Sequence, residues 1–178
     1  MKAIKWVVLF SWIVAGSAQA ALNCTVGQSY TTSVGAVFTC VKHGEFGEVW
    51  RAPNGVVWSQ NLGQWSNSGV ESGSSDATQV CSKIGGTLPG FDDYQHMIFS
   101  YFEIEKGTGL ITGKGLEDLL YFFPDMWLEG FWTTDLYPSK PNLAVVEGQF
   151  IQKNGKLYSG EYHDTKGKYS VRCRDFAN

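Results

Sequence analysis

The four cysteines of this 178-residue sequence constrain its fold more than any other feature. An even number of cysteines in an exported chain indicates two disulfides, for which three connectivities are possible. We favour Cys24–Cys40 and Cys81–Cys173, because the first two cysteines lie in what is predicted to be one antiparallel unit. No Cys-x-x-Cys spacing occurs, so metal ligation by the cysteines is not predicted.

Export is itself predicted, from the first 20 residues. Lys2 and Lys5 precede an apolar run over residues 6–15, and Ala18-Gln19-Ala20 has the small residues of a cleavage site. The run is shorter than the roughly 20 residues that a membrane-spanning helix needs. We expect a signal peptide over residues 1–20 and export to the periplasm, the cell surface or the medium. A lipid anchor on Cys24 is the alternative, which the three residues before that cysteine fit poorly.

The charge of the mature chain limits its partners. Removing residues 1–20 leaves 158 of the 178 residues, a usual size for one domain. Two of the 14 basic residues leave with the signal and none of the 17 acidic ones, so 12 basic residues face 17 acidic ones, a formal charge of −5. This balance argues against a broad basic surface for nucleic acid or anionic membrane. Neutral or cationic partners fit better, and no later apolar segment predicts a membrane span.

Residues 21–54 predict an N-terminal β extension. The runs 30–34 and 37–41 are rich in β-branched and aromatic residues and are separated by glycine. Further on, Asn54-Gly55 separates two similar runs, which is a strong signal for a β-hairpin. The first part of the mature chain is therefore expected to be antiparallel.

The stretch 75–103 predicts two short helices. Ser74 or Ser75 can cap the first helix, which carries Cys81 on its apolar face. The second begins with Asp92 and Asp93 in its first turn, where carboxylates interact favourably with the helix dipole. A third short helix is predicted over residues 115–123.

Strand patterns return after the helices. Residues 129–135 predict a short strand, 143–152 and 156–162 predict a pair around Asn154-Gly155, and 169–174 predict the closing strand. Arg172 and Arg174 alternate with apolar residues there and are expected to make salt bridges on the outer face. The order of strands, then helices, then strands predicts one α+β domain.

Five short motifs, taken in order, resemble a known family. They are Gly55-Val56-Val57-Trp58-Ser59, Ala77 with Cys81, Gly86-Thr87-Leu88-Pro89, Gly130-Phe131-Trp132-Thr133-Thr134 and Val171-Arg172-Cys173-Arg174. Their order resembles the Lcl C-terminal domain family, named for a collagen-like bacterial adhesin, over residues 55–175. The resemblance implies a C-type-lectin-like domain over residues 55–178, with a disulfide between Cys81 on a helix and Cys173 on the last strand. It also implies an exported protein with a binding or adhesion role.

Five residues are the candidate ligand-binding positions. They occupy the segment in which C-type-lectin-like folds carry their variable loops: Trp127, Trp132, Asp135, Tyr137 and Asn142. Aromatic faces stack against sugar rings, and nearby amides or carboxylates orient the hydroxyl groups. For Trp132, beside a predicted strand, a position in the core is the alternative. No cofactor is predicted, because Lys140-Pro141-Asn142 has a lysine where the calcium-dependent lectins have a ligating residue.

The function expected from these observations is non-catalytic binding or adhesion, directed at a glycan or a surface protein, with oligomers possible. A metal-dependent hydrolase is the alternative, because Asp92, Asp93 and His96 could share one helix face. A solvated helix start explains the same three residues without a metal. A structural envelope protein or a protein inhibitor is the third hypothesis.

Overall fold

The computed structural model describes residues 24–43, 47–106, 111, 113–126, 130–148 and 161–174. It is an α+β protein with two sheets. The first sheet is antiparallel, in the order β1-β2-β3-β4, with β1 at Ser29–Thr31, β2 at Val37–His43, β3 at Gly47–Arg51 and β4 at Val57–Trp58. The second sheet has the order β5-β9-β6-β7-β8, with β5 at Gln64–Trp65, β6 at Gly130–Tyr137, β7 at Lys140–Gly148, β8 at Glu161–Asp164 and β9 at Tyr169–Ser170. Among the described strands of this sheet, only β6 and β9 pair in parallel.

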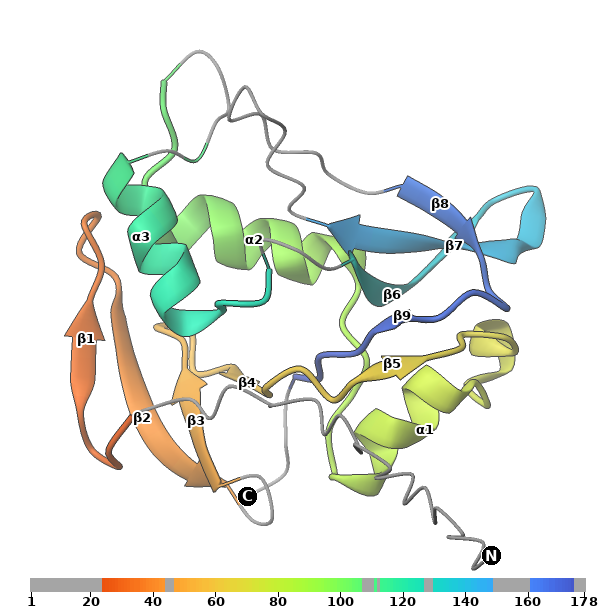
Figure 1. Ribbon diagram of the computed structural model, residues 1–178, viewed down its shortest axis with the longest axis horizontal. Helices are drawn as coiled ribbons and strands as arrows, with labels where there is room; N and C mark the ends of the chain where they lie inside the picture. The colour runs from red at the N-terminus through yellow and green to blue at the C-terminus, as the bar shows by residue number, and fades with distance from the viewer. Residues whose placement is uncertain are drawn as a thin grey trace, which may run out of the picture.

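Between β5 and β6 the described residues form three short α-helices, as the sequence predicted: α1 at Asp76–Lys83, α2 at Phe91–Tyr101 and α3 at Gly113–Phe122. A 3-10 turn at Val70–Ser72 precedes α1. The first sheet and α3 lie at one end of the molecule, the second sheet lies at the other end, and α2 runs between them (Figure 1). None of the described helices is long and apolar enough to cross a membrane.

The start of α1 follows directly from its sequence. The Ser75 side chain accepts a hydrogen bond from the Thr78 backbone N–H at 3.1 Å, which satisfies one of the free amides at the helix N-terminus. Ser75 is itself buried, and its hydroxyl donates to the Asn67 side chain at 2.8 Å. The predicted serine cap is therefore confirmed, and it also ties the helix to the preceding loop.

The favoured disulfide connectivity is confirmed. Cys24 is bonded to Cys40 across the β1–β2 hairpin, and Cys81 of α1 is bonded to Cys173 after β9, with Cα atoms 6.0 Å and 5.4 Å apart. The bridges span 16 and 92 residues of sequence. In the chain-entropy model, loops of these lengths stabilise the fold by roughly 3 and 4–5 kcal/mol.

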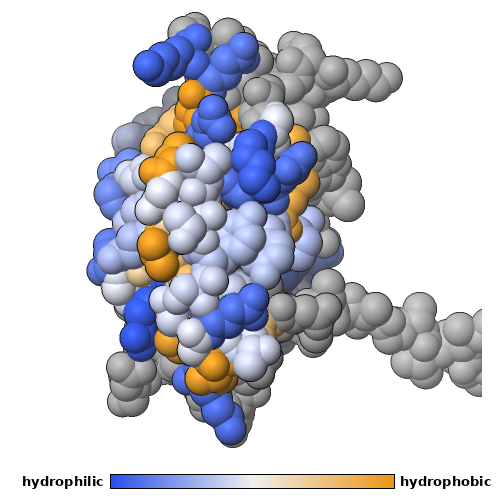
Figure 2. Space-filling view, turned by 90° about the vertical axis from the view of Figure 1, so that its left-hand side faces the viewer, coloured by the Kyte–Doolittle hydropathy of each residue, from blue (hydrophilic) through white to orange (hydrophobic). Residues whose placement is uncertain are grey.

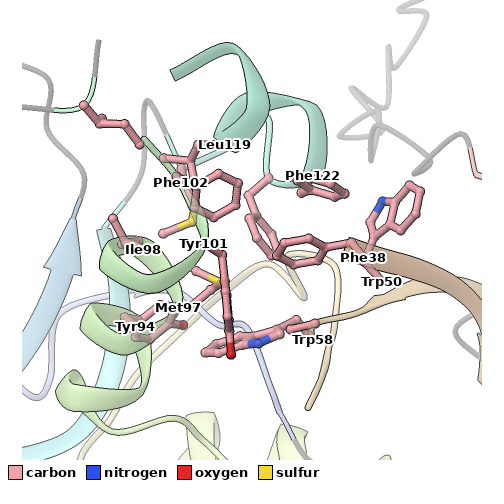
Figure 3. Close-up of a cluster of buried hydrophobic side chains, with 14 of the residues drawn as sticks. Phe38, Trp50, Trp58, Tyr94, Met97, Ile98, Tyr101, Phe102, Leu119 and Phe122 are labelled. Atoms are coloured by element: carbon pink, nitrogen blue, oxygen red, sulfur yellow. The ribbon is translucent and has the colours of Figure 1, made fainter. Parts of the chain in front are cut away.

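Aromatic side chains fill the space between the first sheet and the helices α2 and α3 (Figure 3). Phe38 of β2 stacks on Phe122 of α3 with ring centroids 4.1 Å apart, and it meets Tyr101 of α2 edge-on at 5.8 Å. A fully buried phenylalanine of this kind contributes about 1.5–3 kcal/mol. The β segment predicted as an N-terminal extension, residues 21–54, thus shares its core with the helices. The first sheet also takes in β4, beyond residue 54.

Residues 171–173 are buried, and the segment 171–174 is held on two sides. Ser59 N–H donates to the Cys173 carbonyl at 2.8 Å, and Thr87 N–H donates to the Arg174 carbonyl at 2.8 Å. The predicted closing strand 169–174 is a regular strand only over β9. Its second half bonds to two separate segments, one at residues 58–59 and one at Thr87, and not to one continuous strand. The hairpin predicted around Asn154-Gly155 lies outside the described residues.

Arg172 and Arg174 both form ion pairs, but not both on an outer face. Arg172 is 1% exposed, binds Asp125, and packs its guanidinium between the rings of Phe123 and Phe131 at 4.8 Å and 5.0 Å. The prediction of an outer face is wrong for Arg172, because residues 171–173 are all buried and leave no side of this segment facing solvent. Arg174 pairs with Asp93 at the start of α2.

A buried carboxylate fastens the β1–β2 hairpin to α3. Asp118 is fully buried; it accepts hydrogen bonds from the Tyr30 hydroxyl at 2.9 Å and the Ser33 backbone N–H at 2.7 Å, and Lys114 Nζ lies 3.3 Å away. Burial raises the pKa of Asp118, but the hydrogen bonds from Ser33, Tyr30 and Lys114 lower it by more, so the net pKa lies below its ordinary value. The charged form is therefore the one that the fold stabilises.

We predict that Asp118 makes the protein acid-sensitive. Because the folded-state pKa is depressed, its contribution is present above the unfolded pKa of about 3.9 and is lost as pH falls through the folded pKa. Asp118→Asn should lose roughly 1–3 kcal/mol at neutral pH, since hydrogen-bond donors are left poorly paired. Urea unfolding at pH 7 and pH 3 should show a flatter pH dependence for this variant than for the wild type. Glu117→Gln, at the exposed neighbour, is the control; equal behaviour of the two variants would contradict the assignment.

Candidate binding surface

Trp132 does not lie on a surface. Its side chain is fully buried in β6, the indole Nε1–H donates to the Trp65 carbonyl at 2.7 Å, and the ring meets Tyr169 edge-on at 4.9 Å. The strand β6 lies inside the sheet, between β9 and β7. Trp132 packs on the face of β6 that is covered by the core around the Cys81–Cys173 bridge. Trp132 therefore supports the second sheet from within and is removed from the candidate surface.

Asp135 has a structural partner. Its Oδ2 accepts a hydrogen bond from the Phe91 backbone N–H at 2.6 Å, and Asp93 Oδ2 accepts one from the Gly90 N–H at 2.7 Å. The first free amides of α2 are thus satisfied by one carboxylate from its own first turn and one from β6. A side chain at position 90 would meet Asp135 Oδ2 at 3.3 Å, so glycine allows this close approach. Asp135 fastens β6 to α2.

Tyr137 and Asn142 flank the turn between β6 and β7, and they mark the candidate surface. The exposed Asn142 uses its backbone carbonyl to accept a hydrogen bond from Thr165 N–H at 2.9 Å. Tyr137 is half-buried, with Lys140 Nζ 5.8 Å from its ring centroid. Its ring meets that of Tyr162 edge-on, with centroids 4.7 Å apart and planes at 82°. We call Tyr137, Lys140 and Tyr162 the tyrosine cluster.

Strand pairing brings the tyrosine cluster together. In the β6–β7 hairpin, Tyr137 lies opposite Lys140 after two register shifts. In the next strand pair, Tyr162 of β8 lies opposite Val145 of β7. Tyr162 is 48% exposed, and its strand β8 forms one edge of the second sheet as described. Sequence analysis missed it, because Tyr162 and Tyr137 are far apart in the chain and only the β7–β8 register makes them neighbours. The alternation within a predicted strand was the one signal that could have indicated an outward side chain.

The other face of β8 carries a polar group of contacts. His163 Nδ1 lies 2.6 Å from the Tyr169 hydroxyl, and His163 Nε2 lies 3.3 Å from Glu161 Oε2. His163 is opposite the buried Ala144, whereas Tyr162 is opposite Val145, so the two side chains point to opposite faces of the strand. The strand that carries Tyr162 is therefore held on its other face by the contacts of His163 with Tyr169 and Glu161.

Trp127 lies outside the described residues. Among the described tryptophans, Trp65 is 39% exposed, but its Nε1–H is bonded to the Leu62 carbonyl at 2.8 Å and it belongs to β5 at the opposite edge of the second sheet. The candidate surface is therefore built from Tyr137, Asn142 and their neighbours in β7 and β8.

Two of the three side chains of the alternative metal site, Asp93 and His96, have other contacts. Asp93 binds the Gly90 amide and Arg174, and His96 lies beside Ser100 Oγ at 3.2 Å and Tyr101 Oη at 3.5 Å. Within the part of the chain that the structure describes, no three His, Cys, Asp or Glu side chains are grouped so that they could hold a metal ion. The geometry gives a hydrolase centred on Asp92, Asp93 and His96 no support.

Comparisons with protein-family models, with curated proteins and with solved structures found no match to this chain.

We predict that Asp135 acts on stability. Asp135→Ala should lower the free energy of unfolding by about 1 kcal/mol, because the Phe91 amide loses its acceptor at the helix N-terminus. Asp135→Asn, which keeps an oxygen acceptor, should lose less. Denaturant unfolding measures both, and Asn142→Ala at an exposed side chain is the control, with a change within about 0.5 kcal/mol. Equal losses for Asp135→Ala and Asn142→Ala would refute the role.

Proposed function

We propose that the mature chain is an exported, non-catalytic binding module that recognises a glycan through the tyrosine cluster. The observation that carries the proposal is the perpendicular contact of Tyr137 with Tyr162, at the corner where β6, β7 and β8 meet. Tyr162 leaves 48% of its surface to solvent in the absence of any ligand. An exposed tyrosine packed on a half-buried one, both held in place by strand pairing, suits recognition, since little side-chain freedom is lost on binding.

The chemistry of the corner fits a sugar ring. Two aromatic planes at 82° offer one face for stacking against the C–H groups of the ring and one edge beside it. The tyrosine hydroxyls and the Lys140 ammonium add hydrogen-bonding groups next to these faces. Sugars present the same alternation of apolar C–H faces and hydroxyl edges. A neutral glycan also suits a chain whose mature form is acidic.

Fold family and location belong to the same proposal. A C-type-lectin-like fold is supported by the bond between Cys81 on α1 and Cys173 near the chain end, which is the bridge that the resemblance to the Lcl C-terminal domain family implies. Export is supported by the two disulfides, which persist in oxidising compartments, and by the signal-like residues 1–20. The ligand would then lie on an envelope or a cell surface.

Binding of the mature protein to a glycan array tests the proposal. At least one class of glycan should bind, and Tyr162→Ala and Tyr137→Ala should each weaken binding about three- to tenfold, which corresponds to the loss of one aromatic contact. Phe99→Ala is a matched control, because Phe99 is also 48% exposed but lies on α2. Thermal unfolding of each variant checks that the fold is kept.

Two outcomes would refute glycan recognition at this corner. One is the absence of binding to any glycan by a folded protein, which would favour a protein partner. The other is binding that Phe99→Ala weakens as much as Tyr162→Ala, which would show that the tyrosine cluster has no special part.

A further inference from the structure

The β1–β2 hairpin differs in charge from the rest of the chain. Residues 24–41 contain no Asp, Glu, Lys or Arg, although the whole sequence has 17 acidic and 14 basic residues. The hairpin lies at one end of the molecule, with β1 outermost (Figure 1). An uncharged segment at the outside of a charged, exported protein calls for an explanation.

The outer edge of β1 is open. Within the described residues β1 pairs only with β2. Cys40 N–H donates to the Gln28 carbonyl and Thr32 N–H donates to the Ala36 carbonyl, so the even-numbered residues of this strand direct their backbone groups toward β2. By alternation, Ser29 and Thr31 direct their N–H and C=O groups away from the sheet. Edge strands are usually protected from pairing by charges, proline or bulges, and β1 has neither a charged residue nor a proline.

Apolar side chains surround this edge. Val26, Val34 and Val37 are 51%, 50% and 45% exposed, and they are three of the large apolar residues that the described surface exposes. Figure 2 faces this end of the molecule and shows a white and pale-blue centre with separate orange patches, with strongly hydrophilic blue groups mainly around it. Exposed valines at both ends of an open strand edge and on the neighbouring strand indicate a contact surface.

The hairpin is also held rigidly. The Cys24–Cys40 bridge closes its base, Asp118 holds Tyr30 and Ser33, and the Tyr30 ring stacks on Tyr121 with centroids 4.4 Å apart. The backbone groups of Ser29 and Thr31 are therefore presented in a fixed, extended geometry. A partner strand would not have to order them.

We propose that β1 pairs antiparallel with β1 of a second copy of this chain, about a twofold axis at Tyr30. Ser29 of each copy then lies opposite Thr31 of the other, and the outward N–H and C=O groups of these residues form four hydrogen bonds. Val26 and Val34 are each four residues from Tyr30, so the axis brings Val26 of one copy to the same end of the strand pair as Val34 of the other. The two four-stranded sheets become one sheet of eight strands.

Charge favours a second copy as the occupant. Two acidic chains of the same kind repel each other, and the repulsion is smallest where both surfaces carry no charge. The strand is also complementary to itself, because its outward groups and its two exposed turn valines are placed symmetrically about Tyr30. A partner of opposite charge would gain nothing from this hairpin. The short strand predicts a weak dimer that forms as concentration rises.

Sedimentation equilibrium of the mature, disulfide-bonded protein tests the dimer. The average mass should rise from monomer toward dimer with concentration. Thr31→Pro should weaken association about tenfold or more, because proline removes an outward N–H and is tolerated on edge strands. Thr31→Ala removes the same side chain and keeps the N–H, so it should dimerise nearly as the wild type does. Thermal unfolding confirms that both variants are folded.

Hydrogen exchange locates the contact without any substitution. The amides of Ser29 and Thr31 should gain protection as protein concentration rises, whereas the Thr32 amide, already bonded to Ala36, should not change. A protein that stays monomeric at every concentration would overturn the proposal. So would a dimer that Thr31→Pro leaves intact, or one in which Ser29 and Thr31 gain no protection.

Discussion

The structure depends on how residues 171–174 are held. Cys173 is covalently bonded to α1, its backbone exchanges hydrogen bonds with Ser59, and its neighbour Arg174 does the same with Thr87. Arg172 adds an ion pair with Asp125 in which the guanidinium is buried, and Arg174 adds a partly exposed ion pair with Asp93. One four-residue segment thus joins both sheets, α1, α2 and the loop after α3. Removing one partner of a buried ion pair of this kind is strongly destabilising, because the other charge is left unpaired.

The two sheets have different surroundings and therefore different surfaces. The first sheet packs an aromatic core against α2 and α3 and leaves an uncharged edge at one end of the molecule. The second sheet packs against the bridge between Cys81 and Cys173 and carries the tyrosine cluster at the other end. If both proposals hold, a dimer through β1 directs its two binding surfaces outward at opposite ends. Such an arrangement binds two ligands and gains from their effective concentration on a surface.

Local signals were sufficient for much of the framework. The Ser75 cap, the cysteine pairing and the three helices were predicted because each depends on neighbouring residues or on a small number of possible pairings. The candidate site was predicted only in part. Tyr137 and Asn142 lie where the β6–β7 turn was expected, but Trp132 is in the core and Asp135 fastens a helix. A sequence pattern marks an aromatic residue beside a strand without showing which face of the sheet is covered.

The sequence alone determined the composition of the elements: which residues begin a helix, which runs form strands, and that the four cysteines bond in two pairs. It also determined the uncharged stretch from Cys24 to Val41. Only the tertiary structure decided that Arg172 is buried, that Tyr162 meets Tyr137, and that β1 ends its sheet. The physical reason is that these properties depend on strand order and register. Strand order and register depend on residues that are far apart in the chain, so no local sequence pattern predicts them.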